Sequence, residues 1–145
     1  MKKLTAFILA LFVVSQVSAG EGEWLTDLPA AQAKAKAEGK MVLMDFTGSD
    51  WCPPCKALHK NVLSTKEFLE FAKSRLILVE VDFPTRKPQS PELKKANEAL
   101  QKKYSIEGFP TVIVLDKNGK KVFEKSGYGG DAKTYLAKLK AELTK

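Results

Sequence analysis

Residues 41–55 read MVLMDFTGSDWCPPC, and this stretch decides the fold. Met41–Phe46 is a short apolar run, which is typical of a strand buried on both faces, although a buried helical segment has the same pattern. Cys52 and Cys55, the two cysteines of the chain, follow at the start of a segment that favours helix. Two thiols three positions apart on a first helical turn are close enough to bridge. The stretch therefore predicts a redox-active pair.

Around this stretch the sequence predicts alternating helices and strands. Gly39 ends the first helix, and Ser64 with Glu67 resembles a capping box that restarts a broken one. The predicted helices are 28–38, 56–63, 64–73, 92–104 and 131–143, and the predicted strands are 41–46, 76–81, 111–115 and 120–125. Because helices connect the first two strands, these should be parallel, and a turn at 116–119 adds an antiparallel strand. We expect an α/β fold with a four-stranded mixed sheet and helices on both faces.

The amino terminus has the pattern of a secretory signal. Lys2 and Lys3 precede an apolar run from Leu4 to Val14, and small residues follow up to Ala19. We expect residues 1–19 to be a cleaved signal peptide and residues 20–145 to form one domain in the periplasm or outside the cell. An uncleaved amino-terminal anchor is the alternative, and no cysteine follows Ala19 to carry a lipid.

The charge pattern argues against a nucleic-acid partner. The formal net charge is +7, and without the signal 22 Lys and Arg face 17 Asp and Glu, a net of about +5. The lysines are scattered along helix-favouring segments and are not gathered beside aromatic residues. This pattern is typical of a solvated surface.

Two cysteines in an exported protein can also be a structural bridge or metal ligands. A bridge that closes a four-residue loop restricts the unfolded chain by only ~2 kcal/mol, so a purely stabilising disulfide would do better elsewhere. Zinc needs four ligands, and His59 is the one histidine available to assist. We therefore expect no metal and no cofactor.

The sequence resembles the thioredoxin family. The residues that carry the resemblance are the WCPPC run, the Asp-Phe pair in the strand before it and the segment Gly108–Thr111, which reads GFPT. The resemblance covers about residues 24–144. It implies that Cys52 is the nucleophile, that Cys55 resolves the mixed disulfide, and that Pro110 is cis and packs beside the pair.

The residues support these roles independently. Cys52 is placed at a helix amino terminus, where a thiolate is favoured, and Cys55 lies deeper on the same side. Asp45 is a carboxyl group inside an apolar strand, so burial should raise its pKa and let it take the proton of Cys55. The alternative is that Asp45 binds a loop backbone or faces water. The sequence has one more residue between Asp45 and Cys52 than typical thioredoxins, and Leu78 stands where those proteins have a buried lysine.

Three further residues are candidates for contact with a partner peptide: Trp51, Phe109 and Thr111. Packing alone explains the two aromatic residues equally well. His59 follows Cys52 by about 10 Å along the helix axis, which is too far for a catalytic dyad and favours a bystander. The proline-rich loop 83–91 leaves the sheet on the side that carries Cys52, so it is either a specificity element or a tolerated surface insertion.

These patterns predict a monomeric thiol:disulfide oxidoreductase. We expect it to reduce disulfides of other exported proteins and to be recharged by a membrane-linked dithiol donor. The two prolines and the absence of a histidine between the cysteines favour reduction. The alternatives are a disulfide-forming oxidase, a copper-binding or metallochaperone module, and a non-catalytic adhesive domain.

Overall fold

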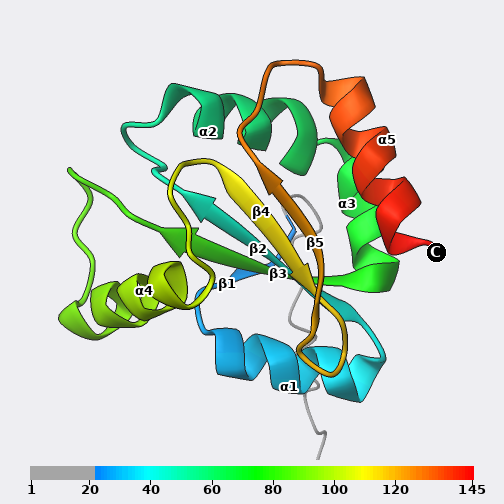
Figure 1. The fold of residues 1–145 in the computed structure, drawn as a ribbon, viewed down its shortest axis with the longest axis horizontal. Helices are drawn as coiled ribbons and strands as arrows, with labels where there is room; N and C mark the ends of the chain where they lie inside the picture. Colours follow the sequence, from blue (N-terminus) through cyan, green and yellow to red (C-terminus); the bar gives the residue numbers. More distant parts are fainter. Residues whose placement is uncertain (1–21) are drawn as a thin grey trace, which may run out of the picture.

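A five-stranded mixed sheet forms the centre of the protein (Figure 1). The computed structural model describes residues 22–145. The strands lie in the order β1-β3-β2-β4-β5, with β1 and β2 parallel to β3 and with β4 antiparallel to both β2 and β5. Their bounds are β1 Trp24–Leu25, β2 Met41–Thr47, β3 Leu76–Asp82, β4 Thr111–Leu115 and β5 Lys121–Ser126.

The predicted fold class is confirmed, with one more strand than expected. The sequence predicts four strands, and the structure adds β1 at the edge, paired with β3. Two residues are too few to show a hydrophobic period, so β1 leaves no pattern in the sequence. The predicted signal peptide, and any anchor in its place, lies outside the described residues.

Helices cover both faces of the sheet. Helices α2, α3 and α5 pack on one face, and α1 and α4 pack on the other (Figure 1). Across residues 22–145, none of these helices is long and apolar enough to cross a membrane. Their bounds are α1 Leu28–Glu38, α2 Pro53–Leu58, α3 Lys66–Arg75, α4 Pro91–Lys103 and α5 Ala132–Leu143, and a π-helical turn, His59–Leu63, extends α2.

Short-range signals set most helix ends. Gly39 adopts the left-handed conformation, with a φ of 66°, and ends α1 as predicted. The Asp131 side chain accepts the Thr134 N–H and begins α5. The predicted capping box at Ser64 is wrong by one position. Thr65 is the cap of α3, because its hydroxyl accepts the N–H of Phe68 at 3.3 Å.

Alternation along β2 divides the core in two. Leu43 packs with α2, α3 and α5, whereas Val42, Met44 and Phe46 pack on the opposite face with α1. Successive strand residues point to opposite faces, so Asp45 shares the face of Leu43. The parallel register also pairs Thr47 with Asp82, so the carboxyl ends of β2 and β3 meet at one edge. The loop that carries the two cysteines begins at this edge.

Candidate active site

Cys52 and Cys55 form a disulfide on the first turn of α2. Their Cα atoms are 5.3 Å apart. Cys52 is the N-cap residue, with extended backbone angles, and Pro53 occupies the first helical position, where no intrahelical N–H is needed. Both cysteines are buried, with exposed fractions of 3% for Cys52 and 1% for Cys55. The predicted pairing and its position at a helix amino terminus are therefore present.

A tight turn at Gly48 places Trp51 and Cys52. The Gly48 carbonyl accepts the N–H groups of Trp51, at 3.2 Å, and Cys52, at 2.9 Å. The Trp51 indole lies directly over the Gly48 Cα, so a Cβ at position 48 would fall 2.6 Å from Nε1 of that ring. Residue 48 must therefore be glycine for Trp51 to lie where it does. Sequence analysis missed this requirement, because a glycine in a loop has many explanations.

The Gly108–Thr111 segment approaches from the other side of the site. The Phe109–Pro110 peptide bond is cis, as the resemblance implies. Thr111 is buried, and its hydroxyl donates to the Gly108 carbonyl at 2.8 Å and lies 3.2 Å from Ser126 Oγ. The Thr111 side chain thus supports the loop from inside, and its contact with a substrate stays a prediction.

Three aromatic rings connect the two segments. Trp51 meets Phe109 edge to face with ring centroids 6.0 Å apart, and Phe109 lies 5.1 Å from Phe83. Trp51 is 41% exposed, and its indole N–H donates to the Phe83 carbonyl at 2.7 Å. The rings thus form a continuous apolar rim beside the disulfide, and the rim includes Phe83, which the sequence did not indicate.

Asp45 is buried beneath this site, with 3% of its surface exposed. Its Oδ1 has no hydrogen-bond partner among residues 22–145. Burial, followed by the nearby carboxylates of Glu80 and Asp82, raises the pKa of Asp45 to about 7. The alternative that Asp45 binds a loop backbone or faces water is not what the structure shows. Its carboxyl group can exchange a proton near neutral pH.

The loop after β3 is fastened to the residues just before Cys52. The carboxylate of Asp50 accepts three successive backbone N–H groups, from Thr85 at 3.0 Å, Arg86 at 2.7 Å and Lys87 at 2.9 Å. Desolvation opposes ionisation of Asp50, but these hydrogen bonds outweigh it and hold the pKa at about 2. The loop is thus fixed to the segment that leads into Cys52.

A second fastening joins Asp82 to Ser49. The Asp82 carboxylate accepts the Ser49 N–H at 2.9 Å and the Ser49 hydroxyl at 2.5 Å, and Lys87 Nζ donates to the same hydroxyl at 3.0 Å. Asp50 and Asp82 stand more than thirty positions from their partners. No local sequence pattern therefore identifies Asp50 and Asp82 as loop anchors. The one available signal is their position close to the ends of β2 and β3.

His59 follows Cys55 by four residues and begins the π-helical turn. Its ring packs against Trp24, with centroids 6.1 Å apart, and it lines a hollow together with Glu80. Among the residues that the structure describes, no group of three or more histidine, cysteine or acidic side chains is arranged to hold a metal ion.

The sequence profile of the thioredoxin-like domain family matches residues 28–142. The chain belongs to this family. Together with the bonded cysteine pair, membership of this family makes the protein a redox enzyme of the thiol:disulfide oxidoreductase class.

Particular relatives agree in sequence and in structure. The disulfide bond reductase DsbH of Chlamydia pneumoniae is 32% identical over 127 residues, which cover 88% of this chain and 76% of that protein. A solved structure of a DsbH oxidoreductase matches with a TM-score of 0.78 at 31% identity, covering 92% of each chain. The thiol:disulfide interchange protein DsbD of Vibrio cholerae is 36% identical over 98 residues, which cover 68% of this chain but 15% of that protein.

Proposed function

We propose that this protein is exported by residues 1–19 and that residues 20–145 reduce disulfides of other exported proteins. The observation that carries the proposal is the Cys52–Cys55 disulfide at the amino end of α2, beside an aromatic rim in which Trp51 is exposed. The reducing direction is supported by two prolines, and no histidine, between the cysteines. The relative DsbH is itself named a disulfide bond reductase.

The reaction begins with the reduced pair. The Cys52 thiolate attacks one sulfur of a substrate disulfide, and the other substrate sulfur leaves as a thiolate. Cys55 then gives its proton to Asp45 and attacks the Cys52 sulfur, which releases the second substrate thiolate and closes the Cys52–Cys55 bond. Two electrons pass to the substrate. A membrane-linked dithiol donor restores the pair, and the monomer needs no cofactor.

The aromatic rim positions the substrate in this proposal. Trp51 and Phe109 present apolar surface next to Cys52, and Pro110 lies between Phe109 and the buried strand β4. An extended peptide on either side of a disulfide can lie against such a rim, since large aromatic rings supply contact area at little entropic cost.

The decisive test is trapping together with a reduction potential. Cys55→Ser should accumulate mixed disulfides between Cys52 and exported proteins, because resolution is blocked, while Cys52→Ser should trap none. Equilibration with glutathione, followed by fluorescence of Trp51, gives the potential. A value near thioredoxin's ~−270 mV supports a reductase, whereas a value near ~−120 mV would indicate the oxidase instead.

A further inference from the structure

Glu80 on β3 lies directly opposite Asp45 on β2. The parallel register makes the two residues Cα partners, and partners in adjacent strands point to the same face at a spacing of about 5 Å. Two carboxyl groups are therefore neighbours on the face that also carries α2 and its cysteines. Leu78, where typical thioredoxins have a lysine, lies one step along the same face.

Among residues 22–145, no cationic side chain forms an ion pair with Asp45. Its Oδ1 is unpartnered, and no ion pair within residues 22–145 includes Asp45 or Glu80. Glu80 is only partly buried, so it has access to solvent that Asp45 lacks. A proton on Asp45 can therefore reach solvent through the neighbouring carboxylate of Glu80.

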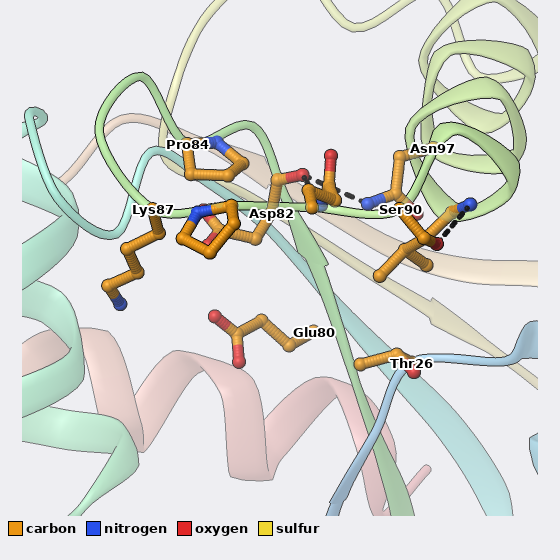
Figure 2. Close-up of a pocket in the computed structure, with 10 residues that line it drawn as sticks. Thr26, Glu80, Asp82, Pro84, Lys87, Ser90 and Asn97 are labelled. Atoms are coloured by element: carbon orange, nitrogen blue, oxygen red, sulfur yellow. Dashed lines mark hydrogen bonds between the residues drawn. The ribbon is translucent and has the colours of Figure 1, made fainter.

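Glu80 borders two hollows in the surface. One, of about 310 Å³, is lined by Glu80 with His59 and Ser64. The other, of about 260 Å³, is lined by Glu80 with Asp82 and Lys87, and Figure 2 shows Glu80 between Lys87 and Thr26. A water molecule takes about 30 Å³ of liquid volume, so each hollow admits several. The Glu80 carboxyl group therefore has water within reach from two sides.

The charges around the pair come from four elements. Burial raises the pKa of both carboxyl groups most, and the charge of Asp82 on β3 adds to the increase in each. The charges of Lys87 in the loop and of His59 in the π-helical turn lower the pKa of Glu80. Tyr135 of α5 faces Asp45, and burial followed by the charge of Asp45 raises its pKa, so it stays protonated throughout the working range.

We propose that Glu80 is a positioning residue of the redox reaction, which acts through Asp45 by sharing the proton released from Cys55 and passing it to water in the adjoining hollows. In the forward step, the Cys55 thiol loses its proton to Asp45 as its sulfur bonds to Cys52. Asp45 then passes the proton to Glu80, and Glu80 gives it to water. No electron moves in the transfer, and both carboxylates return to their starting state.

The two steps can be timed separately with DTNB, an aromatic disulfide whose thiolate is coloured. The reduced protein releases one thiolate when Cys52 attacks and a second when Cys55 resolves the mixed disulfide. In Glu80→Gln, the pH midpoint of the second release should fall by ~0.5 to 1 pH unit, since a like charge beside Asp45 is gone. Below the wild-type midpoint, the second release should be faster than in wild type. An unchanged or raised midpoint would overturn the proposal.

Two controls isolate the effect. Glu98→Gln removes a carboxylate from α4, which is not part of the Asp45–Glu80 pair. This substitution should leave the pH midpoint of the second thiolate release unchanged. Glu80→Asp keeps the charge and should restore the wild-type midpoint of the second release. In Asp45→Asn, adding Glu80→Gln should shift nothing further, because Glu80 acts through Asp45; a further shift would contradict the proposal.

A measurement on the wild-type protein serves if Glu80→Gln fails to fold. Carbon NMR of the side-chain carboxyls should show Asp45 and Glu80 each titrating in two steps, as coupled groups do. Single, independent steps would overturn the proposal. The proposal about Glu80 rests on the proposed thiol:disulfide chemistry of Cys52 and Cys55, and not on whether that reaction reduces or oxidises the substrate. An oxidising potential would therefore refute the proposed reductase while leaving the pH shift to be judged by itself.

Discussion

Asp45 is the residue whose protonation affects stability most directly. Its pKa is about 7 in the folded protein, against 3.8 for an ordinary aspartate. The folded-state value is the higher one, so the neutral carboxyl's contribution to stability is complete below about pH 4. It is lost as the pH rises through about 7. A difference of about three pKa units corresponds to roughly 4 kcal/mol as an upper limit.

We therefore expect Asp45→Asn to be more stable than wild type at pH 8, by a few kcal/mol at most, and to lose this advantage towards pH 5. Urea unfolding of the oxidised protein across this range measures the difference. Asp116→Asn, which changes an exposed turn, is the control and should not alter the slope with pH. An advantage that is the same at every pH would contradict the assigned pKa.

Gly48 provides a second prediction for a single residue. In Gly48→Ala, the new Cβ would collide with the Trp51 indole, so the ring must leave its bond to the Phe83 carbonyl. We expect a red-shifted tryptophan emission, slower reduction of substrate disulfides and a stability loss of ~1–3 kcal/mol. Gly129→Ala is the matched control, because a Cβ there meets nothing within 4 Å. Equal effects of the two substitutions would show that Trp51 is not held as described.

At the scale of elements, the loop between β3 and α4 depends on Asp50. The three N–H groups that Asp50 accepts belong to consecutive residues, so removing its charge should free that whole segment at once. In Asp50→Asn, we expect amide exchange at residues 85–87 to speed up while β2 and β3 stay protected. Mass spectrometry of peptic fragments measures this.

The Asp50 substitution has a natural comparison elsewhere in the chain. Asp116 accepts the N–H groups of Asn118 and Lys120 in the β4–β5 turn, so Asp116→Asn should loosen that turn alone. The wild-type loop should also loosen as the pH falls towards 2, since the pKa of Asp50 is depressed to about that value. Unchanged exchange at residues 85–87 in Asp50→Asn would mean that other contacts hold the loop.

Elements with strong local signals could be predicted from the sequence. β2 follows from its apolar run, Gly39 caps the end of α1, and Asp131 caps the start of α5. The π-helical turn His59–Leu63 could not be predicted, because its sequence is compatible with an ordinary helix. The cap moved from Ser64 to Thr65 for a similar reason, since either hydroxyl can cap and only the three-dimensional geometry selects one.

For the whole molecule, the sheet order predicts how stability is distributed. β2 lies at the centre of the sheet between β3 and β4, and its residues from Val42 onward are buried. β5 lies at an edge and is largely exposed. We expect amides of β2 to exchange slowest and those of β5 markedly faster, because edge strands open by local fluctuations. Exchange in β5 as slow as in β2 would contradict this order.

The candidate site was predictable where it lies within one short stretch of sequence. Cys52, Cys55 and the buried strand with Asp45 all fall within 41–55, and Pro110 followed from the resemblance. The rest depends on strand register and on contacts between segments more than thirty residues apart. Glu80 becomes the neighbour of Asp45 only once β2 and β3 are paired, and Asp50 meets Thr85 only across the sheet edge.

The contact between Asp50 and the loop has a consequence for protein engineering. In the chain, one strand and three helical segments separate the Asp50 carboxylate from the N–H groups that it accepts, yet they form one mechanical unit. Transplanting residues 83–91 into another thioredoxin-like scaffold should therefore fail to reproduce their shape unless the donor's Asp50 is moved with them. A designer who wishes to move this loop must treat the two distant segments as a single cassette.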